Sequence, residues 1–186
     1  MSNSAPTSEP PAQSGRLSYG PQGSVPESQN PFATWISRAL TILIDGLVAA
    51  AMFLVFLIPS ILFFVYSVQF YEDEFGELKF VVTNLGLFLA GVAVLIVGFL
   101  VNLGFVFWNN IYRVAKTGAS IGKKVMGIAV VRQDNGQFLS VGMSFLRYLM
   151  YVLLTSVCFI NYFWPLIDGQ RRAWHDMVVE TYVVKR

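Results

Sequence analysis

Two residues of opposite charge interrupt a long apolar stretch in the first third of the chain. Arg38 and Asp45 are seven residues apart, which is two turns of a helix and about 10 Å along one face. That separation is too large for a direct ion pair in a regular helix. A carboxylate at the bilayer centre costs about 3 kcal/mol unless it faces protein, water or a counter-charge. Asp45 could therefore bind and release a proton or a cation, with Arg38 favouring its charged form.

Each of these two residues also has a simpler interpretation. Asp45 could serve only as a structural hydrogen-bonding group. The long side chain of Arg38 could extend to the lipid headgroups and anchor the helix there. The residue types alone leave both alternatives open.

A second apolar stretch carries a polar stripe of its own. Gly98, Asn102, Phe105 and Asn109 follow one another at spacings of four, three and four residues. Small residues let helices approach closely, and asparagine can hydrogen-bond across the contact. The stripe predicts helix packing, and together with the first stripe it could form a narrow path for an ion or a proton.

The glycine-rich segment 118–124 resembles a phosphate-binding loop only in part. The spacing between its glycines is one residue short, and no serine or threonine follows the lysine. We therefore expect no nucleotide there. Lys123 and Lys124 are expected to contact anionic lipid headgroups instead.

His175 and Asp176 form the last candidate pair. A catalytic histidine–aspartate pair needs a nucleophile beside it, and the sequence identifies none. We expect a surface or capping role, or pH sensing by the histidine. His175 is the one histidine of the chain, which excludes a histidine-based metal site. With no nucleophile, metal cluster or nucleotide loop recognisable, the sequence predicts neither an enzyme nor a cofactor.

The distribution of charge predicts the elements that position these residues. Of 186 residues, 55% are hydrophobic and 13% are charged, far from the usual balance of a soluble protein. No charged residue occurs in 46–71, 80–112 or 148–167. A helix needs about 20 apolar residues to cross a bilayer. We predict an all-α membrane protein, with transmembrane helices at about 35–66 and 81–112 and a third hydrophobic segment at 145–167.

The charges between these segments predict an orientation. Four acidic residues (Glu72, Asp73, Glu74 and Glu77) follow the first helix. Six basic residues follow the second helix, the last of them, Arg147, at the start of the third segment. The positive-inside rule places the basic stretch and the N-terminus in the cytoplasm. Because these basic residues lie beside membrane segments, we expect no nucleic-acid partner, and the first partner is the lipid bilayer.

The third segment poses a topological question. Thr155, Ser156 and the Asn161–Pro165 region interrupt it, as in a broken or re-entrant helix, which is tolerated where protein or water covers it. The β-branched runs 125–131 and 182–184 predict a small cytoplasmic β element. If the two runs pair, both ends of the third segment lie on one side; a single crossing would place the C-terminus outside.

Residues 1–31 differ from the rest of the chain. They are rich in Ser, Pro, Gln and Gly and contain few large apolar residues. Such a segment buries too little surface to offset its ordering entropy, so we predict a disordered cytoplasmic tail. It lacks the apolar core of a signal peptide. The first helix is then an uncleaved anchor, and 32–186 form the membrane domain.

Three ordered motifs in 31–186 resemble the RDD family of bacterial membrane proteins, named for one arginine and two aspartates. Arg38 and Asp45 match the first two of these residues. Residues 118–131 resemble the middle motif, and 168–176 followed by 181–184 resemble the closing motif. The second aspartate corresponds to Asp176, with Asp168 as the other candidate.

The sequence departs from the family pattern at two positions. Trp174 stands where leucine is commoner, and Ala129 stands where arginine is frequent. The second departure removes one basic contact of the loop. Because Arg38 and Asp176 are expected on the same membrane side, the resemblance makes them candidate partners.

The resemblance implies a multi-pass protein of the bacterial plasma membrane. The family is suspected of transport, including sodium or proton exchange. We therefore expect a transporter or a cation/proton exchange component; because three helices are few for transport, it would act as a homo-oligomer or within a larger membrane complex. The alternative is a non-transporting accessory or assembly subunit of such a complex.

Overall fold

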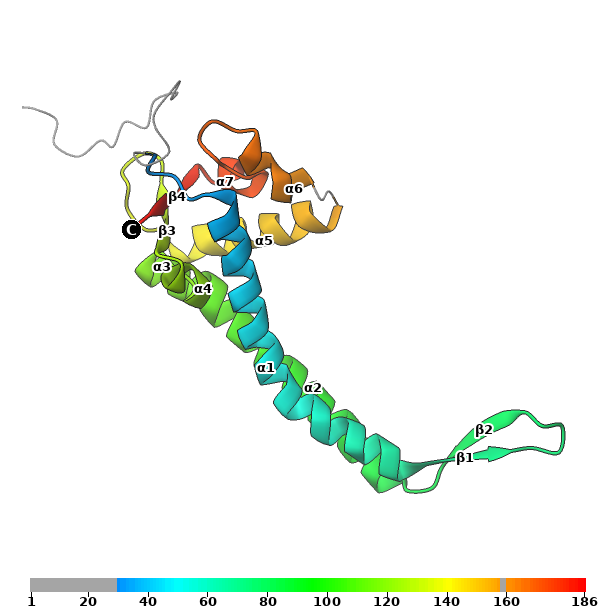
Figure 1. Ribbon diagram of the computed structural model, residues 1–186. Helices are drawn as coiled ribbons and strands as arrows, with labels where there is room; N and C mark the ends of the chain where they lie inside the picture. Colours follow the sequence, from blue (N-terminus) through cyan, green and yellow to red (C-terminus); the bar gives the residue numbers. More distant parts are fainter. Residues whose placement is uncertain (1–29, 158–159) are drawn as a thin grey trace, which may run out of the picture.

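The computed structural model describes residues 30–157 and 160–186. The tail predicted for 1–31 lies outside the described residues except for its last two positions. In the described part, two long helices extend away from a compact end that contains the remaining helices and a small sheet (Figure 1).

Helix α1 (Trp35–Ser67) and helix α2 (Leu85–Phe107) form the long antiparallel pair. Each begins at a side-chain cap, since Thr34 accepts a hydrogen bond from the Ser37 backbone N–H and Asn84 accepts one from that of Leu87. Helix α2 continues into the π-helical turn η2 (Trp108–Tyr112) and α3 (Arg113–Thr117). The expected first helix is thus confirmed almost to the residue.

Glycines on α2 allow the two helices to touch. A Cβ built on Gly98 would lie 2.4 Å from the Cβ of Phe56, which no real side chain could occupy. One heptad earlier, the Ser60 hydroxyl donates to the Gly91 carbonyl oxygen at 2.9 Å. The small residues therefore act as close-contact points, as they do between membrane helices.

The loop between the long helices corrects two sequence-based expectations. Strands β1 (Val68–Glu72) and β2 (Leu78–Val82) pair antiparallel as a hairpin, with Phe70 opposite Phe80. The second helix, expected from about 81, therefore begins only at Leu85. The run before it is short and rich in β-branched and aromatic residues, which favours a strand over a helix. The description all-α is accordingly too narrow, because the fold is mostly helical with two small sheets.

The second sheet confirms the predicted β element. Strands β3 (Ile128–Arg132) and β4 (Thr181–Lys185) pair antiparallel. Residues 31–33 add to the edge of β4, since the Ala33 N–H donates to the Val183 carbonyl and Phe32 forms an isolated bridge with Val184. The sheet thus ties the start of α1 to the C-terminus, at one end of the molecule (Figure 1).

The third hydrophobic segment is broken, as one of the predicted alternatives required. It consists of α5 (Val141–Val157), α6 (Ile160–Phe163) and the 3₁₀ turn η3 (Trp164–Leu166). The direction of 160–166 is bent by 117° from that of α5. Two further short helices, α4 (Ile121–Val125) and α7 (Trp174–Val178), complete the compact end. Because β3 precedes the segment and β4 follows it, both of its ends lie beside the same sheet.

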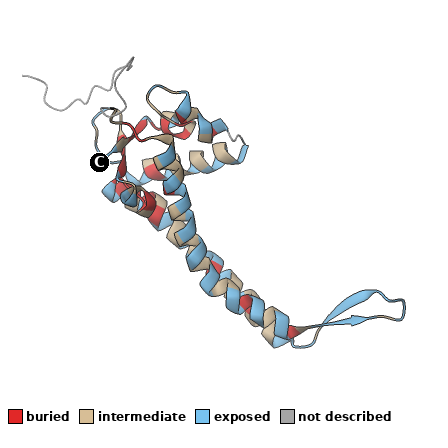
Figure 2. Ribbon diagram, viewed as in Figure 1, coloured by how far each residue is buried: buried red, intermediate tan, exposed pale blue. Residues whose placement is uncertain are grey.

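Burial is concentrated at the compact end (Figure 2). Ala33, Val114, Val130 and Val183 belong to its apolar core. Along the long helices only 6% and 11% of the most apolar windows are buried within the chain, and both helices are long and apolar enough to cross a membrane. Apolar surface of that extent needs an apolar environment, which a bilayer supplies.

Candidate functional site

The carboxylate of Asp176 is held by two arginines. Asp176 lies in the first turn of α7 and is fully buried. Arg38 of α1 donates from Nη1 to its Oδ2 at 2.6 Å, and Arg147 of α5 donates from Nε to its Oδ1 at 3.0 Å. The Ala173 backbone N–H adds a third contact at 3.2 Å. The predicted pairing of Arg38 with Asp176 is confirmed.

Electrostatics keep this carboxylate ionised. Burial by itself raises the pKa of Asp176, but the charges of Arg147 and Arg38, with the hydrogen bond from Arg38, outweigh it and hold the pKa well below its usual range. The two guanidinium groups are themselves almost buried, with side chains 12% and 11% exposed. Buried charges of this kind tolerate the loss of a partner poorly. The cluster therefore fastens α1, α5 and α7 together.

His175 is buried beside this cluster, at 8% exposure, and not at the surface as expected. Burial lowers the pKa of His175 to about 3, so its ring is neutral at physiological pH. Nδ1 lies 3.3 Å from Oδ1 of Asn161, an oxygen that can only accept, so Nδ1 carries the proton. Nε2 then accepts from Nη2 of Arg147 at 3.4 Å. The ring is a fixed connector between two polar groups.

Asp45 lies in a separate set of hydrogen bonds. Its carboxylate accepts from Nδ2 of Asn109 at 2.9 Å, from Oγ of Ser120 at 2.6 Å and from the Gly122 backbone N–H at 2.8 Å. A Cβ on Gly122 would lie 2.4 Å from the Thr41 carbonyl oxygen. Only glycine therefore lets α4 approach α1 closely enough for the third bond.

The segment that failed as a nucleotide loop thus binds an anion of its own chain. Ser120 caps α4, and the Gly122 N–H in the first turn of that helix donates to Asp45. Donors at a helix start attract negative charge whether it belongs to a phosphate or to a carboxylate. Arg38 and Asp45, two turns apart on α1, therefore have different partners. The closing motif binds Arg38 through Asp176, and the middle motif binds Asp45 through Ser120 and Gly122.

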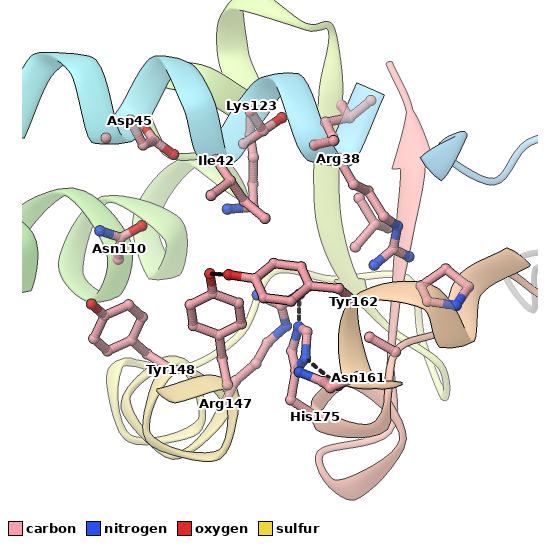
Figure 3. A pocket seen from close by; sticks show the side chains of 18 of the residues that line it. Arg38, Ile42, Asp45, Asn110, Lys123, Arg147, Tyr148, Asn161, Tyr162 and His175 are labelled. Atoms are coloured by element: carbon pink, nitrogen blue, oxygen red, sulfur yellow. Dashed lines mark hydrogen bonds between the residues drawn. The ribbon is translucent and has the colours of Figure 1, made fainter. Parts of the chain in front are cut away.

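A cavity of about 390 Å³ lies between these two sets (Figure 3). Arg38, Asp45, Lys123 and Arg147 supply its charged walls. Lys123 extends into it from α4 (Figure 3), with Nζ 3.3 Å from Oγ of Ser120. Burial, followed by the charge of Arg147, lowers the pKa of Lys123 to about 8.

The two neighbouring lysines of α4 are thus separated by the fold. The sequence predicted headgroup contacts for both. Lys124 is exposed, as that prediction requires, whereas Lys123 is turned inward to the cavity. Their opposite environments on one short helix make them a matched pair for experiments.

The remaining sequence candidates lie outside the charged cluster. Asp168 pairs with Arg172, Oδ2 to Nε at 3.1 Å, and shapes the loop before α7. Asp176 is therefore the aspartate that meets Arg38. Of the α2 stripe, Asn109 reaches Asp45, whereas Oδ1 of Asn102 is buried with no hydrogen-bond partner among the described residues.

Sequence reasoning missed the role of Arg147 and Asn161. Arg147 is the one charged residue of α5, and a lone charge in an apolar run is a signal that could have identified it. Asn161 is buried, and it joins His175, the Trp174 backbone and Thr155. No pattern in the sequence indicates these contacts of Asn161, which the sequence presents only as a polar interruption of an apolar run.

The helix pair and the charged end together define a protein of membrane type. A profile of the RDD family matches residues 32–180, a range that contains Arg38, Asp45 and Asp176. The chain belongs to the RDD family.

Several curated relatives are similar to parts of this chain. The proline-rich antigen homologue of Mycobacterium tuberculosis is 35% identical over 82 residues, 44% of this chain and 34% of the relative. The proline-rich antigen of Mycobacterium leprae is 36% identical over 77 residues, 41% and 31% of the two chains. The match thus spans about a third of these mycobacterial proteins. The uncharacterized protein YxaI of Bacillus subtilis is 27% identical over 159 residues, 84% of this chain and 98% of YxaI. No solved structure matches significantly.

Proposed function

We propose that this chain is a small, non-enzymatic transport component of a bacterial plasma membrane. It would be multi-pass, with its N-terminus in the cytoplasm, and its substrate would bind in the cavity between α1 and α5. The observation that carries the proposal is the cavity itself, a space of about 390 Å³ bordered by both Asp45 and Lys123. Two long helices and a broken third segment are few for transport, so the working form would be a homo-oligomer or part of a larger complex.

The hydrogen bonds of Ser120 support a role for protons. Its Oγ donates to Asp45 and accepts from the backbone N–H and the ammonium of Lys123, both at 3.3 Å. A hydroxyl oxygen has two lone pairs, and these two contacts occupy both. A proton arriving on Asp45 must be donated to an acceptor, and if Ser120 accepts it, one Lys123 contact is displaced. Protonation of Asp45 would thereby change how Lys123 is held in the cavity.

Proton flux in proteoliposomes tests this proposal. Purified chain is reconstituted in vesicles with a trapped pH dye, and pH or sodium gradients are imposed. We expect flux that disappears in Asp45→Asn. Asp134→Asn is the matched control, since Asp134 is 49% exposed in a turn beyond β3. Wild-type vesicles that show no flux under any gradient would contradict the proposal.

The hairpin favours a second candidate, a non-transporting accessory subunit. β1 and β2 project beyond the ends of the long helices (Figure 1), and the cross-strand pair Phe70 and Phe80 is 70% and 68% exposed. Exposed aromatic residues gathered on one face suit contact with another protein. A stoichiometric membrane partner recovered in mild detergent, and lost with Phe70→Ser/Phe80→Ser, would favour this candidate. Recovery of the chain alone would count against it.

A further inference from the structure

The cavity has more positive than negative charge around it. Arg38, Lys123 and Arg147 contribute three cations, and Asp45 and Asp176 contribute two carboxylates. The neighbouring imidazole of His175 is neutral, with a pKa of about 3. One positive charge is therefore uncompensated. In a partly desolvated site, an uncompensated cation attracts an anion strongly.

Lys123 is the cation that no carboxylate contacts among the described residues, although the charges of Asp45 and Asp176 act on it from farther away. Arg38 and Arg147 share Asp176, and Asp45 is hydrogen-bonded to neutral donors. Within 30–157 and 160–186, the Lys123 ammonium makes one hydrogen bond, to Ser120, and no ion pair. Its lowered pKa, about 8, has the same origin: burial and the nearby Arg147 disfavour the charged form.

Further hydrogen-bond donors face the same space. Arg38 lines the cavity, and its buried Nε has no hydrogen-bond partner among the described residues, although no accessible surface of that atom opens to the cavity. The hydroxyls of Tyr151 and Tyr162 lie 2.8 Å apart, and only one of the two hydrogens can be used between them. The other hydroxyl hydrogen is available to an acceptor. The unsatisfied groups of the cavity are thus donors, as an anion-binding site requires.

The opposite end of the cavity is mainly apolar, and part of its wall is not covered by the chain. Ile42, Gly46 and Ala49 of α1 line it together with Phe105 and Val106 of α2. Ile42 is 39% exposed and Gly46 is exposed, so this wall is not covered by the chain. The cavity follows α1 from Arg38 to Ala49, eleven residues and about 16 Å. Along that length its lining changes from mainly cationic to mainly apolar, with Asp45 and Asn110 as the polar residues near the apolar end.

We propose that the cavity binds an anionic phospholipid, with its phosphate at Lys123 and Arg147 and an acyl chain along Ile42, Gly46 and Ala49. The inference rests on the proposed function in that it takes the same cavity as the binding site, and it names the chemical class of the occupant. A free phosphate shares the headgroup chemistry. The apolar half of the cavity favours the lipid, since a free phosphate would leave that half without a partner.

Lipid retention by the purified full-length chain tests the charged end. The chain is equilibrated with phosphatidylglycerol in phosphatidylcholine nanodiscs, extracted in mild detergent, and the lipids that remain bound are counted by native mass spectrometry. We expect retention of phosphatidylglycerol in preference to phosphatidylcholine. Lys123→Met should reduce that retention at least tenfold. Lys124→Met removes the same charge from the exposed neighbour, and therefore only a headgroup contact outside the cavity, so it should reduce retention far less. Equal retention by both variants would overturn the proposal.

A second variant pair tests the apolar end without altering any charge. A Cβ at Gly46 or at Gly104 meets nothing within 4 Å, so both positions accept a larger side chain. Gly46→Phe fills the cavity mouth and should displace the lipid. Gly104→Phe adds the same ring to α2, at an exposed position that does not line the cavity. Unchanged retention in Gly46→Phe would overturn the placement of the acyl chain.

Inorganic phosphate distinguishes the two sources of the anion. Isothermal titration of phosphate into the detergent-solubilised chain should show no binding that Lys123→Met removes. Phosphate binding that depends on Lys123 but not on Gly46 would overturn the lipid assignment. None of these assays uses a gradient. A native chain that shows proton flux but retains no phosphatidylglycerol would therefore reject this inference alone. Retained lipid without flux would instead reject the transport proposal.

Discussion

Replacement of Asp176 should destabilise the protein more than replacement of either arginine that binds it. Asp176→Asn leaves both Arg38 and Arg147 without their counter-charge in a buried site. Breaking a buried ion pair by removing one partner costs about 3–5 kcal/mol, and two stranded guanidinium groups place this variant near the upper end. Arg38→Gln leaves Asp176 paired with Arg147 and removes a charged hydrogen bond, at a cost of about 2 kcal/mol.

Arg147 also decides the outcome of a charge swap. The double variant Arg38→Asp/Asp176→Arg would rescue an isolated ion pair. Here the new arginine at position 176 would face Arg147, which contacts Asp176 directly. The new carboxylate at position 38 would attract the arginine at position 176, so we expect partial recovery relative to Asp176→Arg alone. The double variant should nevertheless stay well below the native stability, because a repulsion from Arg147 replaces the second ion pair.

Unfolding in mixed micelles measures these differences. Increasing fractions of sodium dodecyl sulfate in dodecyl maltoside unfold the chain, and tryptophan fluorescence follows the transition. Trp174 directly precedes His175 and Asp176. The Trp35 indole N–H donates to the Tyr162 carbonyl oxygen at 2.8 Å. The fluorescence of both tryptophans therefore reports on the compact end. Asp134→Asn is the control, with an expected change below about 1 kcal/mol, as for exposed pairs.

Two results would refute this reasoning. Equal losses in Arg38→Gln and Asp176→Asn would show that Arg147 contributes nothing to the cluster. A charge swap that returns to within about 1 kcal/mol of the native protein would show that the pair of positions 38 and 176 is independent of Arg147, since only an isolated pair can be reversed without cost.

Three further predictions concern neighbouring contacts. The pKa of His175 is about 3 when folded and ordinarily 6.5, so the unfolded state binds the extra proton and stability should fall as pH drops from about 6.5 toward 3; His175→Gln should flatten that dependence in pH-resolved unfolding. Gly122→Ala places a Cβ 2.4 Å from the Thr41 carbonyl and should cost about 2 kcal/mol, whereas Gly142→Ala, with open space around it, should change the unfolding midpoint little. Asn109→Leu removes a donor to Asp45 and the acceptor of the Ile121 N–H; a loss of about 2 kcal/mol is expected, and a variant as stable as the native chain would show that Asp45 does not need that amide.

The middle motif illustrates why a motif needs its spatial context. Glycines, a serine and lysines at nearly the right spacing resemble a nucleotide site, and the missing residue of spacing excluded that function. Their actual partner is Asp45, which precedes Ser120 by 75 residues in the chain. The same donors that bind phosphate elsewhere here close α4 against α1.

Much of the architecture could be predicted from the sequence because membrane spans are local. About 20 uncharged apolar residues suffice to indicate a span wherever the rest of the chain lies. The sequence therefore predicted α1 almost to the residue, and it gave the broken third segment and the β3–β4 pairing as alternatives that the structure bears out. It also placed Arg38 and Asp176 on one membrane side, through the resemblance to the family.

Only the tertiary structure decided how the charges are satisfied. A side-chain partner depends on which distant segments the fold brings within about 3 Å, and no local pattern encodes that distance. Arg147 enters the cluster because α5 packs against α7, and Lys123 differs from Lys124 because α4 lies against α1. The sequence by itself thus determined that Arg38 and Asp45 needed partners. The fold determined that these partners are different, with the cavity between them.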